Sequence, residues 1–214
     1  MKSYKSLYLI IGIALFCSVS YGQTEAGAAK QKLVEGNKRF VSSQMIHPNS
    51  SSQTRTELTK GQHPFAVIVS CSDSRVPPEV VFDQGLGDLF VIRTAGEVVD
   101  DIAIASIEYA VEHLGTKLIV VMGHQKCGAV DAAIKGKKLT PSLNKLMAAI
   151  APAVVEAKKQ NGNLLYNAIH ENVNRIVKQL SASKPVLEEF VHEHKLNVIG
   201  AYYNLDSGVV DFLK

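Results

Sequence analysis

The chain has 214 residues, of which 46% are hydrophobic and 20% are charged, and its formal net charge is +3. This composition is typical of a globular protein, and the length suits one domain with extra arms. The small net charge and the lack of a basic stripe argue against a nucleic acid partner.

The first residues have the pattern of a secretory signal peptide. Lys2 and Lys5 precede the apolar stretch Leu7–Val19, which is too short to span a bilayer comfortably. Ser20–Gly22 then places small residues at alternate positions, as at a cleavage site. We therefore predict that residues 1–22 are removed during export and that the mature protein is periplasmic.

Cleavage after Gly22 leaves a chain that begins at Gln23 and has no stable membrane insertion. Loss of the two lysines lowers the formal net charge from +3 to +1. An uncleaved membrane anchor is the alternative. A lipoprotein attached through Cys17 is a weaker alternative, because the bulky Phe16 stands where a small residue is needed.

Residues 23–63 are expected to form an N-terminal helical arm and linker. Apolar residues recur at helical spacing over Ala28–Phe40. The polar residues 49–56 that follow are expected to be an irregular connection. Residues 64–214 are then expected to form one α/β domain.

The middle of the chain alternates strands with helices. Three short apolar runs, Phe65–Ser70, Leu89–Arg93 and Leu118–Met122, fit strands that are buried on both faces. Asp101–Leu114 has the spacing of a helix. This alternation predicts a central, mainly parallel β-sheet flanked by helices.

The remaining chain is expected to be helical first and extended at its end. Pro152 is expected to interrupt the first of these helices. The expected helices are Leu143–Lys159, Leu164–Leu180 and Val186–His194, and the expected strands are Val198–Tyr203 and Val209–Leu213.

Two cysteines and a histidine follow strands of the predicted sheet. Cys71 comes after the first strand, and His124 and Cys127 come after the third. Because the carboxyl ends of parallel strands form the ligand crevice, we expect the three side chains to meet. Cys, His and Cys are a zinc ligand set that leaves the fourth position open. A disulfide between the two cysteines stays open as an alternative.

The segment after Cys71 adds a carboxylate and a guanidinium. Arg75 can pair with Asp73 through two hydrogen bonds. The simplest interpretation is an ion pair that stabilises the loop. The functional interpretation is a carboxylate held beside a metal-bound water.

Together, the motifs CSDSR and GHQKCG resemble those of the β-class carbonic anhydrases, and the likeness extends from Leu33 to the last strands. The resemblance implies reversible hydration of carbon dioxide to bicarbonate, one Zn²⁺ per chain, and catalytic roles for Asp73 and Arg75. It assigns the zinc to Cys71, His124 and Cys127. It also implies a homodimer or tetramer in which the N-terminal helix packs on the partner.

The resemblance further assigns a narrow substrate pocket, part of which comes from the other subunit. Gln62 matches a substrate-binding amide, Phe90 and Tyr109 match pocket aromatics, and Gly96 lies in the loop beside them. Without the family resemblance, the sequence would indicate that Phe90 and Tyr109 are ordinary core residues and that Gln62 is a solvated loop residue.

One departure from the family concerns a second, inhibitory bicarbonate site. Some members build it from a tryptophan, an arginine and a tyrosine. Here Ile68 stands at the tryptophan position, although Arg93 and Tyr203 match the other two.

Two alternative functions remain: a carbon disulfide or carbonyl sulfide hydrolase, and a non-catalytic zinc or redox-sensing protein.

Overall fold

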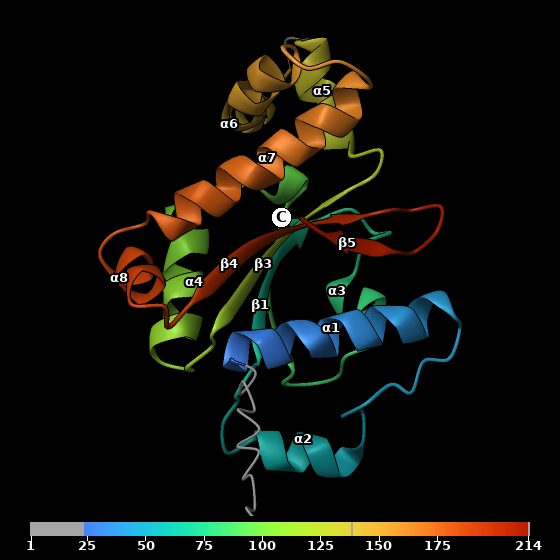
Figure 1. Cartoon of the computed structure of the whole chain (residues 1–214), viewed down its shortest axis with the longest axis vertical. Coiled ribbons are helices and arrows are strands. Elements are labelled where there is room, and N and C mark those ends of the chain that lie inside the picture. The colour runs from blue at the N-terminus through green and yellow to red at the C-terminus, as the bar shows by residue number, and fades with distance from the viewer. Residues whose placement is uncertain (1–23, 138, 214) are drawn as a thin grey trace, which may run out of the picture.

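The computed structural model describes residues 24–137 and 139–213, so the expected signal peptide lies outside the described residues. Its centre is a five-stranded sheet in the order β2-β1-β3-β4-β5 (Figure 1). All neighbours are parallel except β4 and β5, which confirms the predicted mainly parallel sheet. The strands are β1 (Ala66–Cys71), β2 (Leu89–Thr94), β3 (Leu118–His124), β4 (Asn197–Tyr203) and β5 (Val210–Phe212).

Helices surround the sheet, and two of them show the main differences from the expectation. Within the described residues they are α1 (Glu25–Val41), α2 (Ser52–Leu58), α3 (Pro78–Val81), the short 3-10 helix η1 (Ala95–Glu97), α4 (Asp101–Glu112), α5 (Gly128–Lys135), α6 (Pro141–Ala157), α7 (Leu164–Ser181) and α8 (Val186–His192). None of the described helices is long and apolar enough to cross a membrane.

The first difference is α2, which forms where an irregular polar connection was expected. Its N-cap is Ser51, whose hydroxyl accepts a hydrogen bond from the backbone N–H of Thr54 at 3.0 Å. The second difference is α6, which continues through Pro152. Ile150 and Val154 on either side of the proline are buried in the core, and this packing keeps the helix continuous.

The central strands are buried on both faces because helices cover each face of the sheet. Successive side chains of a strand point to opposite faces. Ile68 of β1 thus packs in the cluster that contains Leu33 of α1. Its neighbours Val67 and Val69 pack in a second cluster with Ile107 of α4. Figure 1 shows α1 on one side of the sheet and α4, α7 and α8 on the other.

The first helix of the arm is anchored to the rest of this subunit. Leu33 is fully buried. The side-chain amide of Asn37 donates to the carbonyls of Val81 and Gly208 at 3.0 and 2.9 Å, and its oxygen accepts from Val210 N–H at 2.9 Å. The amide therefore ties α1 to α3 and to β5. The contact of the arm with a partner subunit stays a prediction.

A buried carboxylate holds the chain that leaves α1. Asp83 accepts hydrogen bonds from the Arg39 guanidinium and from the backbone N–H groups of Ile46 and His47. Burial opposes its ionisation, but these hydrogen bonds together hold the pKa of Asp83 below its usual value. The carboxylate therefore stabilises the fold in its charged form.

We expect Asp83→Asn to lower the free energy of unfolding by about 2 kcal/mol at pH 7, because it removes the charged acceptor of the partly exposed Arg39 guanidinium. Because folding lowers the pKa of Asp83, its carboxylate stabilises the folded state above the unfolded pKa of about 3.9. This stabilisation is lost as the pH falls through the pKa of the folded state. The difference between wild type and variant should therefore shrink below about pH 4. Urea unfolding at pH 7 and pH 3.5 measures it. Asp211→Asn, at the exposed position of β5, is the control, and an equal loss in both variants would contradict the role of Asp83.

Candidate metal centre

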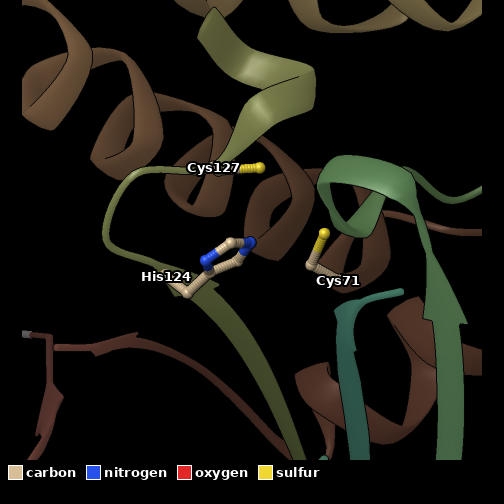
Figure 2. Close-up of side chains that lie close together, drawn as sticks. All are labelled: Cys71, His124 and Cys127. Carbon is tan, nitrogen blue, oxygen red and sulfur yellow. The ribbon is translucent and has the colours of Figure 1, made fainter. Parts of the chain in front are cut away.

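The predicted ligands meet at the carboxyl edge of the sheet. Cys71 is the last residue of β1 and His124 the last residue of β3, and these two strands are parallel neighbours. Cys127 is the N-cap of α5. The three possible ligand atoms all lie within 4.8 Å of one another, and all three residues are buried. Figure 2 shows their side chains pointing toward a common centre.

A tight turn brings Cys127 back beside His124. Lys126 adopts a left-handed conformation with φ of 57°, which reverses the chain between the two ligands. The backbone N–H of Gln125 donates to the carbonyl of Tyr203 at 2.9 Å and fixes the turn to β4. Gly123 leaves no room for a side chain, since a Cβ there would lie 2.7 Å from Val173.

The donor set fits a zinc ion. His124 Nδ1 lies 2.9 Å from the carbonyl oxygen of Gln125, which leaves Nε2 facing the two sulfurs. This Nε2 is buried and has no hydrogen-bond partner among the described residues, as expected of a nitrogen reserved for a metal. One imidazole and two thiolates form a tetrahedral zinc set with one position left for water or substrate.

Cys71 and Cys127 are free cysteines, and their pKa values are shifted in opposite directions. The hydrogen bond from Cys127 lowers the pKa of Cys71, and the same contact raises the pKa of Cys127. The contact therefore favours the thiolate form of Cys71, and a thiolate is the form that binds metal. Gly96 adds a backbone N–H that donates to Cys71 Sγ at 3.3 Å. This places Gly96 beside the site, where the sequence predicted it.

Asp73 and Arg75 form the predicted two-pronged ion pair. Arg75 Nε and a terminal nitrogen donate to the two carboxylate oxygens at 2.9 and 2.7 Å, and the Arg75 backbone N–H donates to Oδ1 at 3.0 Å. These bonds hold the pKa of Asp73 well below its usual range. Asp73 Oδ2 lies 4.0 Å from His124 Nε2, so an ionised carboxylate stands at the edge of the candidate metal centre.

Arg93 has a structural contact that the sequence did not suggest. Its guanidinium donates to the backbone carbonyls of Cys71 and Asp73, at 3.0 and 2.6 Å. Arg93 therefore fixes the turn that carries the candidate ligand Cys71 and the carboxylate of Asp73. Ile68 and Tyr203, the other positions compared with the family's inhibitory site, are buried.

The remaining predicted pocket residues lie apart from this centre within one chain. Gln62 is exposed after α2 and lines a surface hollow with Leu86 and Gly87. Tyr109 is 49% exposed on α4. Phe90 of β2 packs against the cluster of α4. Their substrate-binding roles therefore stay predictions, as does the expected contribution of a second subunit to the pocket.

The sequence of this chain is similar to those of known carbonic anhydrases. A sequence profile described as carbonic anhydrase matches residues 66–210. Carbonic anhydrase 2 of Mycobacterium tuberculosis is 40% identical over 189 residues, which cover 86% of this chain and 91% of that protein. The carbonic anhydrase of Mycolicibacterium smegmatis is 37% identical, with 86% and 91% covered.

Solved structures show the same fold. One of the two tetrameric β-carbonic anhydrases from the ascomycete Sordaria macrospora superposes with a TM-score of 0.69 at 28% identity, covering 74% of this chain and 85% of the other. The Coccomyxa β-carbonic anhydrase in complex with acetazolamide gives a TM-score of 0.68 at 27% identity, covering 85% and 84%. The sheet and its Cys-His-Cys edge thus define an α/β enzyme with a candidate metal centre. The chain belongs to the β-class carbonic anhydrase family.

Proposed function

We propose that this enzyme catalyses the reversible hydration of carbon dioxide to bicarbonate and a proton, with one Zn²⁺ per chain. The observation that carries the proposal is the convergence of Cys71, His124 and Cys127 beside the ionised carboxylate of Asp73. Zinc bound there supplies a Lewis acid that turns water into a nucleophile near neutral pH.

The protein groups around the metal orient the reaction. Asp73 stays ionised and accepts a hydrogen bond from the reacting water, which directs the oxygen lone pair toward carbon dioxide. Arg75 restrains that carboxylate through two hydrogen bonds. Gln62, Phe90 and Tyr109 are proposed to contact the substrate in an assembled dimer or tetramer. The tetrameric state of the Sordaria enzymes supports such an assembly.

The test is carbon dioxide hydration by stopped flow on the purified mature chain, with zinc measured in the same sample. We expect turnover that scales with zinc content and is restored when zinc is added back after chelation. Carbon disulfide and carbonyl sulfide, given to the same preparation, test the alternative hydrolase. Faster consumption of either sulfur compound than of carbon dioxide would replace the proposed substrate.

A non-catalytic zinc or redox-sensing protein is the other alternative. It would need the two cysteines but would have no use for a paired Asp73 and Arg75 at the metal edge. Stoichiometric zinc without turnover, in a protein confirmed to be oligomeric, would favour it. An intact Cys71–Cys127 disulfide in native protein, found by mass spectrometry, would do the same.

We also propose that the enzyme acts in the periplasm after removal of residues 1–22. The apolar stretch Leu7–Val19 and the small residues that follow it support export. N-terminal sequencing of exported protein should give Gln23 as the first residue. Recovery of the full-length chain in the membrane fraction would favour the anchor instead.

A further inference from the structure

A buried amide lies behind the candidate metal centre. Asn172 sits in the middle of α7 and is fully buried. Its helix neighbours Ile169, Val173 and Ile176 belong to the apolar core. Burial of an amide in such surroundings costs free energy unless the amide makes hydrogen bonds. The partners of Asn172 therefore show what the side chain does.

Both donor hydrogens of this amide are directed to one turn. Asn172 Nδ2 donates to the carbonyl oxygen of Gly96 at 2.8 Å and to Glu97 Oε1 at 2.9 Å. Glu97 is itself fully buried. The contact joins α7 to a segment 76 and 75 residues away in the sequence.

The turn that Asn172 holds has an unfavourable backbone conformation. Gly96 has φ of 62° and Glu97 has φ of 46°, so two successive residues are left-handed. Glycine adopts this conformation freely, but glutamate does so at a cost. Such a conformation persists only where surrounding contacts impose it. The two hydrogen bonds from Asn172 are contacts of this kind.

The same turn delivers a hydrogen bond to a proposed zinc ligand. Gly96 uses its carbonyl to accept from Asn172 and its N–H to donate to Cys71 Sγ, at 3.3 Å. The turn is also packed tightly, since a Cβ on Gly96 would lie 2.9 Å from Ile150. One peptide segment thus connects the amide on α7 to the sulfur at the end of β1.

We propose that Asn172 is a positioning residue for the metal centre: it holds the Gly96 turn so that the Gly96 N–H stays bonded to Cys71 Sγ. An N–H donor stabilises the charged form of a thiolate and keeps the sulfur oriented. The inference rests on the zinc site of the proposed function, but not on the identity of the substrate. Loss of a contact that orients a ligand typically weakens metal binding by about 10- to 100-fold.

The chain offers a matched control on the same helix. Asn167 is also buried, and its Nδ2 donates to the backbone carbonyl of Asn161 at 3.0 Å. Asn161 belongs to the loop before α7 and not to the Gly96 turn. Asn167→Leu and Asn172→Leu therefore both remove a hydrogen bond from a buried amide to a backbone carbonyl, but only the second also removes the bond to Glu97 and releases the Gly96 turn.

The experiment measures metal binding without relying on turnover. Zinc affinity is determined by competition with a chelator for the oligomeric wild type and both leucine variants. Each protein is then loaded with cobalt(II), and the thiolate-to-cobalt charge-transfer absorption is recorded. We expect Asn172→Leu to bind zinc about 10- to 100-fold more weakly. Its charge-transfer band should move to longer wavelength, because a thiolate without its N–H donor gives up electrons more readily.

Asn167→Leu should match the wild type in both measurements. Equal zinc affinity and equal cobalt spectra in the two leucine variants would overturn the positioning role. If Asn172→Leu does not fold, Asn172→Ala, which leaves space for a water, is compared with Asn167→Ala in the same way. A wild-type protein that binds no zinc would instead overturn the proposed metal site, and the inference with it.

Discussion

Cys127→Ser is expected to lose its bound zinc, and with it all measurable carbon dioxide hydration. Serine has nearly the size of cysteine, but its hydroxyl does not ionise near neutral pH and supplies no thiolate. The remaining Cys71 and His124 lie on adjacent strand ends and offer only two ligand atoms. Cys71→Ser and His124→Ala are expected to have the same effect.

The measurement is zinc per chain by atomic emission after dialysis, with circular dichroism to confirm that each variant folds. Asp73→Ala is the matched control, because it changes the same cluster without removing a proposed ligand. We expect about one zinc per chain in this control and almost none in the three ligand variants. Stoichiometric zinc in folded Cys127→Ser would refute the ligand assignment.

Asp73→Ala is expected to keep zinc but to lower kcat by about 10²-fold, because the reacting water loses the carboxylate that orients it. Arg75→Ala should also keep zinc and lower turnover by a different route. Asp73 Oδ2 is only 4.0 Å from His124 Nε2, so a carboxylate released by Arg75 would be expected to compete with water for the position that the three candidate ligands would leave open on a metal. The ion pair is partly exposed, so its effect is positional more than energetic.

The two variants should differ in their dependence on pH. Two thiolates neutralise the formal charge of zinc, so wild-type activity should rise with pH around a midpoint above the value of about 7 known for three-histidine zinc sites. Arg75→Ala should shift this midpoint upward, since the freed carboxylate competes for the same position. Stopped-flow hydration from about pH 6.5 to 9, with zinc quantified in each sample, tests both effects. Wild-type turnover in Asp73→Ala would reduce Asp73 and Arg75 to an ordinary ion pair.

The ligand cluster could be predicted from the sequence because strand ends are local features. The apolar runs before Cys71 and His124 predicted two parallel strands, and parallel strands align their carboxyl ends at one edge. The short spacing from His124 to Cys127 places both beside a helix start. The pairing of Asp73 with Arg75 follows from their separation of two residues. Each inference needed only neighbouring residues and one rule of sheet geometry.

Tertiary packing decided the secondary structure where the local sequence pattern opposed the outcome. Pro152 disfavours helix, yet the buried Ile150 and Val154 keep α6 continuous. Burial free energy, which a local pattern does not contain, can outweigh helix propensity at a single position such as this proline. The helix α2 was missed for another reason: its polar sequence has no apolar periodicity, and it has no buried residue but is held by local hydrogen bonds such as that of its N-cap Ser51.

The side chains that hold the candidate metal centre in place could not be predicted from the sequence either. Arg93 reaches the carbonyls of Cys71 and Asp73, and Asn172 reaches Gly96 from a helix 76 residues later. In the sequence, Asn172 is only one polar residue in an amphipathic helix. Such contacts join a side chain to a distant backbone group, and backbone groups are chemically the same at every residue. The sequence by itself therefore determined the candidate ligands and the sheet edge where they meet, whereas only the three-dimensional packing decided which side chains hold that edge in place.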